Sequence, residues 1–341
     1  MFDLDFNGFD RHVYETELKD FLPDRFYDFH THVYEASFNA DISHNGGSSW
    51  IDLVADELPA EELLRTYRVL FPDKEVTPLV FGGCLTDLDR NNRYVLEMKD
   101  RYGFPALFRS GYDMPADRLE EEVKKGGFLG LKPYLTNCPP YIPSKEVRIF
   151  DFLPHEHLQA ADRNGWIVML HIPRDGRLRD PVNLAQLLEI EEKYPNVKLI
   201  VAHIGRAYAP EDIGNAFDLL GRTRNMCFDF TANLSPDAIK ACLEAVGPRR
   251  LLFGSDLPIA VMRMYRVTED GVYYNVVPRG LYGDVSHEAH MRESDETEIT
   301  LMIYQQIRVF RQCAAELRLK DSDIEDVFFN NARRLISQAG R

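Results

Sequence analysis

The feature that most constrains the fold of this chain is a regular alternation of short apolar runs with amphipathic segments of helical periodicity. Several runs are almost continuous in Val, Ile, Leu and Phe, such as VKLIVAH and RLLFGSD, which is typical of strands buried on both faces. Strands that alternate with helices predict parallel βαβ units. The predicted strands are Arg25–His30, Thr77–Leu85, Phe104–Arg109, Gly127–Lys132, Trp166–His171, Val197–His203, Met226–Thr231 and Arg250–Asp256.

The segments between these runs carry helix start and stop signals. In SPDAIKACLEAVG, Ser235 suits the N-cap, Pro236 suits the first helical position and Gly247 follows the end. Eight strand–helix repeats in 341 residues favour a (β/α)₈ TIM barrel. An open doubly wound sheet is the alternative, but no G-x-G-x-x-G sequence follows an early strand. The predicted helices include Ala60–Leu70, Asn91–Arg101, Ala116–Lys125, His155–Asn164, Leu184–Tyr194, Pro236–Val246 and Glu298–Leu317.

We expect one domain over residues 1–341, with the barrel core at about 25–320 and one long insertion at 257–297. Barrel connections usually have about 2–6 residues, whereas about forty follow Asp256. The stretch MYRVTEDGVYYNVV predicts a hairpin that turns at Asp270-Gly271. We expect the insertion to fold over the barrel mouth as a lid; a role in subunit contacts alone is the alternative. Its candidate ligand contacts are Tyr282, His287, His290 and Arg292.

The charge balance narrows the class of partner. With 40 Lys and Arg against 55 Asp and Glu, the formal net charge is −15. This argues against a nucleic acid or an anionic membrane as the main partner, because both require a positive surface. The sequence shows no signal-peptide pattern and no apolar stretch of about 20 residues. Five scattered cysteines predict reduced thiols. We therefore expect a cytoplasmic homo-oligomer that acts on a small molecule.

Metal-capable side chains end four of the predicted strands. The first strand ends in DFHTH, and three later strands end in MLH, VAH and GSD. In a parallel barrel all strand carboxyl ends open on one rim, so these side chains can converge there. Imidazole with one carboxylate suits Zn²⁺, Fe²⁺, Mn²⁺ or Co²⁺. The candidate residues are His30, His32, His171, His203 and Asp256.

The order HTH, MLH, VAHIGRAY and LLFGSDLPI, followed by a helix that contains NNARRLI, resembles the amidohydrolase superfamily and within it the amidohydrolase-2 branch. This branch includes aminocarboxymuconate-semialdehyde decarboxylase and pyrone-dicarboxylate lactonase. The resemblance covers residues 25 to 256 and the C-terminal helix. It implies a metal-dependent TIM barrel in which His203 is either a ligand of a second ion or a base that polarises the metal-bound water. It also implies the primary metal ligands His30, His32, His171 and Asp256.

The resemblance implies a hydrolase in which a metal-activated water attacks an amide or lactone and Asp256 carries the proton. One divalent ion is expected, with Zn²⁺ first among the candidates. A second ion, held by His203 and a modified Lys132, stays open. The alternatives are a non-oxidative decarboxylase of the same fold and, from another class, a non-catalytic metal-binding barrel. An anionic substrate would meet cations at the rim. The candidate substrate-binding residues are Lys132, Tyr134, Arg174 and Arg206.

Overall fold

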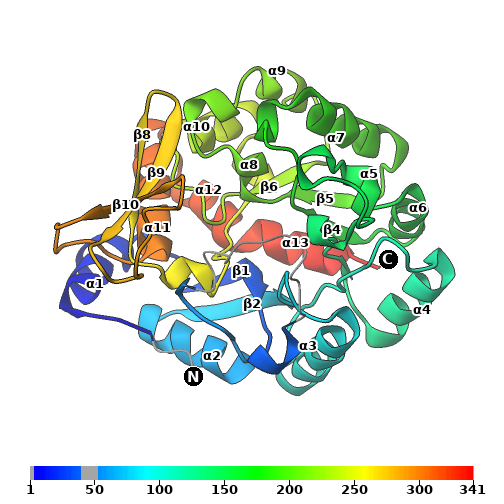
Figure 1. Cartoon of the computed structure of the whole chain (residues 1–341), viewed down its shortest axis with the longest axis horizontal. Helices are drawn as coiled ribbons and strands as arrows, with labels where there is room; N and C mark the ends of the chain where they lie inside the picture. Colours follow the sequence, from blue (N-terminus) through cyan, green and yellow to red (C-terminus); the bar gives the residue numbers. More distant parts are fainter. Residues whose placement is uncertain (1–3, 40–52, 341) are drawn as a thin grey trace.

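The computed structural model of the chain describes residues 4–39 and 53–340, and its framework is a barrel of parallel strands (Figure 1). Strands β1 and β2 pair in parallel, and strands β3 to β7 form a parallel sheet of 5 strands in chain order. The barrel strands are β1 (Arg25–His32), β2 (Glu75–Phe81), β3 (Gly130–Leu131), β4 (Ile167–Leu170), β5 (Lys198–Val201), β6 (Cys227–Asp229) and β7 (Leu251–Leu252).

Backbone contacts join these two sheets into a closed ring. Residues 105–108 lie between β2 and β3 and form parallel bridges, Val80 with Ala106 and Phe108 with Leu131. On the other side, the N–H of Phe29 donates to the carbonyl of Phe253 over 3.0 Å. The segment 105–108 thus acts as an eighth strand. The predicted (β/α)₈ fold is confirmed.

The hydrogen-bonded strands are shorter than the predicted ones. The predicted strand Phe104–Arg109 is held only by isolated bridges. The backbone leaves the sheet before the last predicted residues, because His203 and Asp256 adopt φ values of 58° and 64° that no strand accommodates. Only β1 is longer than predicted, and it includes His32.

Helices surround the barrel, as Figure 1 shows. Two of them, α2 and α10, have the predicted bounds, and Ser235 caps α10 as expected. None of the helices in the described part of the chain is long and apolar enough to cross a membrane. The helices are α1 (Gly8–Val13), α2 (Ala60–Leu70), α3 (Leu88–Tyr102), α4 (Ala116–Gly126), α5 (Ile149–Phe152), α6 (His155–Arg163), α7 (Pro181–Lys193), α8 (His203–Arg206), α9 (Ala216–Leu220), α10 (Pro236–Val246), α11 (Met302–Glu316), α12 (Asp321–Glu325) and α13 (Asn331–Gln338).

The core has two parts. A large apolar cluster fills the space between strands and helices, and a smaller one fills the barrel interior with side chains such as Phe29, Met169 and Ile200. Helix α13 closes the lower end of the barrel, where Leu335 joins the interior cluster. The amide of Asn331 donates to the carbonyl of Leu251 over 2.8 Å and ties this helix to β7.

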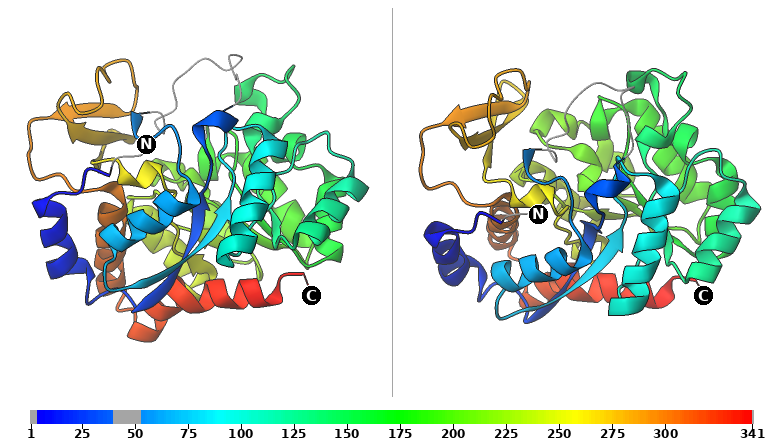
Figure 2. Two further views of the ribbon diagram at one scale, coloured as in Figure 1. Left: turned by 90° about the horizontal axis from the view of Figure 1, so that it is seen from below. Right: turned by 60° about the horizontal axis from the view of Figure 1, so that its bottom comes forward.

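The insertion forms a separate sheet at the end of the barrel opposite α13 (Figure 2). Strands β8 (Tyr265–Glu269) and β9 (Val272–Pro278) form an antiparallel hairpin, and β10 (Met291–Ser294) pairs with β9 in parallel. The turn residues Asp270 and Gly271 have φ values of 50° and 78°, as a type I′ turn requires. The predicted hairpin is therefore confirmed. The polar sequence HNGGSSW, which precedes α2, lies outside the described residues.

Candidate metal centre

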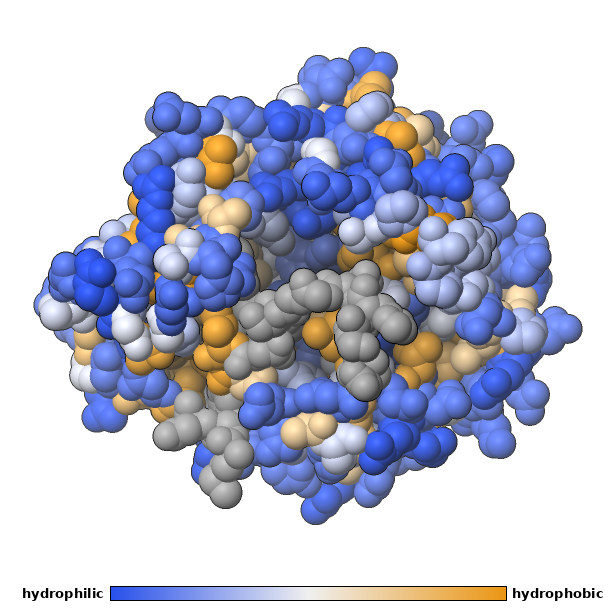
Figure 3. Space-filling model, in the orientation of Figure 1, coloured by the Kyte–Doolittle hydropathy of each residue, from blue (hydrophilic) through white to orange (hydrophobic). Residues whose placement is uncertain are grey.

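Four histidines and one aspartate meet at the carboxyl end of the barrel. The histidine Nε2 atoms nearest to Asp256 Oδ1 are those of His32, at 3.2 Å, and His30, at 3.5 Å. One ligand atom each from His30, His203 and Asp256 lie within 4.8 Å of one another. The ring of His171 lies 5.2 Å from that of His203, centroid to centroid. The face that carries this cluster is hollowed near its centre (Figure 3).

Three of the histidine rings are held by their Nδ1 atoms. His30 Nδ1 donates to Asp229 Oδ2 over 3.0 Å, and His32 Nδ1 donates to the carbonyl of Gly82 over 3.0 Å. His203 Nδ1 donates to the carbonyl of Thr231 over 2.8 Å. Because carbonyl and carboxylate oxygens only accept hydrogen bonds, each Nδ1 carries the proton, and each Nε2 of a neutral ring keeps a free lone pair.

These lone pairs face the carboxylate of Asp256. The cluster therefore brings together groups that can only accept hydrogen bonds, and a cation between them would offset their mutual repulsion. Burial, together with the charge of Lys132, holds the pKa of His30 well below its ordinary value, which favours the neutral ring. Ligand atoms about 2.1 Å from a tetrahedral Zn²⁺ lie about 3.4 Å apart. The distances of 3.2 and 3.5 Å from Asp256 to His32 and His30 agree with this spacing. The donor set therefore fits a divalent ion.

His171 supplies a further sign of a missing partner. Its Nδ1 atom is buried and has no hydrogen-bond partner in the described part of the chain. Burial and the nearby Arg206 lower the pKa of His171 well below its ordinary value, so the ring is neutral. A buried nitrogen without a partner is rare in proteins, and a bound ion or ligand would supply the partner that His171 lacks.

Asp256 remains ionised in this setting. Burial opposes its charge, but the histidines that face it, His32 first among them, hold the pKa of the carboxyl below its usual range. Its side chain is 18% exposed, whereas that of His30 is 0% exposed. Asp256 is therefore the member of this pair that a substrate at the mouth can reach.

Asp229, which lies at the end of β6, was not among the residues predicted from the sequence. Its Oδ2 atom accepts the proton of His30, and its Oδ1 atom accepts the backbone N–H of His203 over 2.8 Å. A carboxylate that orients a metal-ligating histidine is a common second layer around such sites. The signal was present, because Asp229 interrupts the apolar run MCFDF just where other strands end in His or Asp.

The turn that carries His203 has an unusual backbone. Four consecutive residues, from His203 to Arg206, have φ values between 49° and 60°. Left-handed conformations cost non-glycine residues roughly 1–2 kcal/mol each, and such strain collects at functional sites. The amide of Asn233 stabilises the turn by donating to the carbonyls of His203 and Ala207, each over 3.0 Å.

Lys132 and Tyr134 lie beside the cluster, as predicted for the fourth strand–loop unit. Lys132 Nζ lies 3.3 Å from His30 Nε2, and Tyr134 Oη lies 3.4 Å from His32 Nε2. Burial lowers the pKa of Lys132 to about 8, although Asp229 and Asp256 act in the opposite direction. Both side chains can therefore donate to a substrate oxygen close to the candidate ion.

The two predicted arginine clamps differ in their surroundings. Arg174 is already paired with Asp180 over 3.2 Å and with Glu146 over 3.6 Å, which leaves it little capacity for a substrate carboxylate. Arg206 donates to the carbonyls of Pro173 and Ile172, over 3.0 and 3.4 Å, and its charge acts on His171. Of the two, only Arg206 keeps the character of a cation at the mouth.

The four predicted lid contacts are engaged with other residues of the insertion and with Arg263. Tyr282 accepts a hydrogen bond from the backbone of Arg263, His287 is exposed beside Glu288, and Arg292 pairs with Glu269 at the exposed hairpin end. His290 reaches the mouth only through Tyr273, on which its ring stacks at 4.2 Å. Spacing along the chain could not show which side of the sheet faces the barrel.

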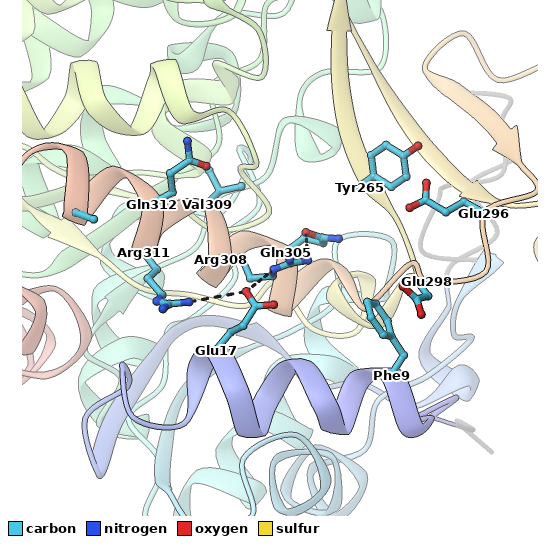
Figure 4. Close-up of a pocket in the computed structure, with 11 residues that line it drawn as sticks. Phe9, Glu17, Tyr265, Glu296, Glu298, Gln305, Arg308, Val309, Arg311 and Gln312 are labelled. Carbon is cyan, nitrogen blue, oxygen red and sulfur yellow. Dashed lines mark hydrogen bonds and ion pairs between the residues drawn. The ribbon is translucent and has the colours of Figure 1, made fainter.

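A second hollow, of about 850 Å³, lies between the N-terminal helices and α11 (Figure 4). Its central charges pair with one another: Glu17 binds Arg308 over 2.9 Å and approaches Arg311 to 3.8 Å. No group of metal-capable side chains was found there among the described residues. The metal-capable group of His30, His203 and Asp256 lies at the barrel mouth instead.

Known protein structures share the fold of this chain. No curated protein matches the sequence. An amidohydrolase from Burkholderia multivorans with bound zinc has a TM-score of 0.61 at 14% identity, covering 92% of this chain and 99% of that chain. A probable 2-pyrone-4,6-dicarboxylic acid hydrolase from Acinetobacter baumannii with citric acid bound gives 0.54 at 15% identity, with the same coverage. The 2,6-dihydroxybenzoate decarboxylase from Rhizobium gives 0.52 at 14% identity, covering 93% and 99%.

At these identities the similarity concerns the fold alone, and the family assignment rests on the sequence itself. The model of the amidohydrolase family matches residues 27–337, which include every barrel strand from Tyr27 onward and all five members of the histidine–aspartate cluster. The resemblance seen in the sequence motifs is thereby confirmed. This chain, an enzyme with a barrel-mouth cluster of histidines and Asp256, belongs to the amidohydrolase family.

Proposed function

We propose that the protein is a metal-dependent hydrolase that cleaves an amide or lactone bond in a small, carboxylate-bearing substrate. The observation that supports this most directly is the convergence of imidazole nitrogens on the carboxylate of Asp256. His30, His32, His171 and Asp256 would hold one divalent ion, and Zn²⁺ suits these donors best. When bound, the ion would polarise the scissile carbonyl group and make a water molecule more acidic.

The residues of the chain have distinct roles in this reaction. Asp256 accepts the proton of the attacking water on its carboxylate and delivers it to the leaving group. Lys132 Nζ and Tyr134 Oη donate to the oxygen on which negative charge develops. His203, held by Thr231, lies close enough to His30 and Asp256 to orient the water or to bind a second ion.

Decarboxylation without an oxidant is the second candidate. A 2,6-dihydroxybenzoate decarboxylase that shares the fold supports this candidate. The same cations at Lys132 and Arg206 would hold the carboxylate that leaves as CO₂. Asp256 would first take a proton from a water molecule and then deliver it to the carbon atom from which CO₂ departs. The two reactions differ in their products, which makes the choice experimental. The cytoplasmic location and the homo-oligomeric assembly stay predictions.

The test starts with protein purified without chelator, whose metal content is measured by elemental analysis. Carboxylate-bearing lactones, amides and carboxylated phenols are then assayed for acid and CO₂ release. We expect about one ion per chain, and we expect Asp256→Asn to lower kcat by about 10²–10⁴ while the protein stays folded. Asp284→Asn, an exposed acid in the insertion, is the matched control. Turnover that survives both metal removal and Asp256→Asn would contradict the proposal.

A further inference from the structure

The hairpin of the insertion places one arginine against the barrel mouth. The guanidinium carbon of Arg266 lies 4.7 Å from the ring centroid of Tyr208 and 4.8 Å from that of Tyr273. Its Nη1 atom lies 3.4 Å from the carbonyl of Ala232. Ala232 directly follows Thr231, whose carbonyl holds His203. Arg266 therefore contacts the residue that follows Thr231, the residue that holds His203.

Tyr208 links Arg266 to the reacting groups. Burial raises the pKa of Tyr208 to about 12, Arg206 and Arg266 act to lower it, and Asp256 acts to raise it. The guanidinium of Arg266 lies over the ring of Tyr208, and both Arg266 and Asp256 act on the pKa of this tyrosine. The contact with the carbonyl of Ala232 places the hairpin next to Thr231, which holds His203.

Arg266 has no carboxylate partner among the described residues, whereas Arg177, which lies over the same two tyrosine rings, has one. Arg177 also lies over the ring of Tyr273, at 4.8 Å, but it forms an ion pair with Asp212 over 2.6 Å. Among the described residues, no carboxylate lies within ion-pair distance of Arg266, whose Nε atom donates to the neutral amide of Asn275 over 2.9 Å. A half-buried cation without a counter-ion favours an anionic ligand.

Asn275 supplies an independent observation that points to a ligand. It lies opposite Arg266 in the β8–β9 ladder and is fully buried. Because its Oδ1 atom accepts from Arg266, the orientation of the amide is fixed. Its Nδ2 atom then remains as a buried donor that finds no acceptor in the described part of the chain. Buried donors of this kind are rare unless a ligand or water completes them.

We propose that Arg266 and Asn275 bind a carboxylate of the substrate that is remote from the reacting bond. The guanidinium and the amide present N–H donors side by side, and the rings of Tyr208 and Tyr273 hold the guanidinium in place before the ligand arrives. Substrates would then carry one carboxylate for this site in addition to the group that reacts at the cluster. This inference rests on the proposed function for the position of the reacting bond.

The test compares dicarboxylates with methyl ketones of the same shape, which the enzyme cannot hydrolyse. Isophthalate is paired with 3-acetylbenzoate and glutarate with 5-oxohexanoate, and binding to the metal-loaded protein is measured by titration calorimetry. We expect the dicarboxylate of at least one pair to bind tighter by on the order of tenfold. Arg266→Gln should reduce this preference to about one, with unchanged metal content. Arg279→Gln, an exposed arginine of the same insertion, should retain it.

A second variant tests the same site without removing the cation. Asn275→Asp has the same shape and offers Arg266 an internal carboxylate, so it should abolish the preference while the hairpin remains folded. A wild-type preference near one, or a preference that persists in both variants, would overturn the inference.

Turnover separates the inference from the proposed function. If the preference behaves as expected in a protein without metal-dependent turnover, the carboxylate site stands and the proposed reaction is wrong. If turnover depends on Asp256 but no preference exists, the proposed reaction stands and the carboxylate site is wrong.

Discussion

At the scale of the residue, Asp229 fixes the protonation of the cluster. It accepts from His30 Nδ1 and thereby leaves His30 Nε2 free as a ligand. In Asp229→Asn, the amide can still accept the N–H of His203, but its NH₂ group then faces His30 Nδ1. His30 would avoid this clash of donors by moving its proton to Nε2, where it blocks coordination.

We therefore expect Asp229→Asn to lower the affinity for Zn²⁺ by about 10- to 100-fold. Competition with a chromophoric chelator measures the affinity, and circular dichroism checks the fold. Asp284→Asn removes one acidic charge at an exposed site and serves as the control. Equal affinities in wild type and Asp229→Asn would show that His30 does not depend on this carboxylate.

Residue patterns in the sequence revealed the members of the cluster but not their support. The histidines and Asp256 could be found because each ends an apolar run, a position that topology turns toward one rim. The missed residues, Arg266 and Asn275, lie in an insertion whose facing side depends on tertiary packing. The pairing of Arg174 with Asp180 also depends on loop conformation, which the chain order does not specify.

At the scale of the element, helices were easier to locate than strands. Capping residues and 3.6-residue periodicity mark helix ends locally, and α2 and α10 have the predicted bounds. A barrel strand ends where neighbouring backbones stop pairing, which is a property of several segments together. The left-handed turn at His203 shortened β5 in this way, and no residue in VAHIGRAY except Gly205 signals it.

The insertion can be removed at a defined point, because its two ends meet. The N–H of Met264 donates to the carbonyl of Thr300 over 3.1 Å. Arg263 lies outside the excised segment and keeps its ion pair with Asp10, at 2.8 Å. A variant in which an Asn-Gly turn replaces residues 265–298 should therefore keep the barrel and its metal content.

We expect this variant to melt within a few degrees of the wild type but to lose most of its kcat/KM. The loss should appear mainly in KM for carboxylate-bearing substrates, since Arg266 and Asn275 are removed while Asp256 remains. Calorimetry, elemental analysis and steady-state kinetics measure the three quantities. Full activity in the shortened enzyme would show that the insertion is no lid and serves other contacts.

At the scale of the whole molecule, the chain as a whole is negative, whereas the side chains near the barrel mouth include several cations. The chain carries a net charge of −15, yet Lys132 and Arg109 are fully buried beside the mouth, and Arg206 lies near them. Net charge therefore describes solubility and long-range repulsion, whereas the local cations decide which ligands enter. The composition argued against nucleic acid as the main partner but could not reveal this local reversal.

The barrel should stay folded when its metal is removed. Its strands are closed by backbone contacts, such as the one from Phe29 to Phe253, that need no ion. Zinc at 100 times its dissociation constant would stabilise the native state by about 2.7 kcal/mol. Dialysis against a chelator should therefore lower Tm by several degrees and leave the far-ultraviolet circular dichroism unchanged. Loss of secondary structure on metal removal would indicate that the ion helps to hold the fold.

The hydrogen bond between Met264 and Thr300 has a consequence for how the enzyme can evolve. A segment whose ends touch can grow, shrink or be exchanged in a lineage while the residues that break bonds stay where they are. Variation confined to this sheet would then change which acids the enzyme binds, while Asp256 and the histidines keep their places in the barrel.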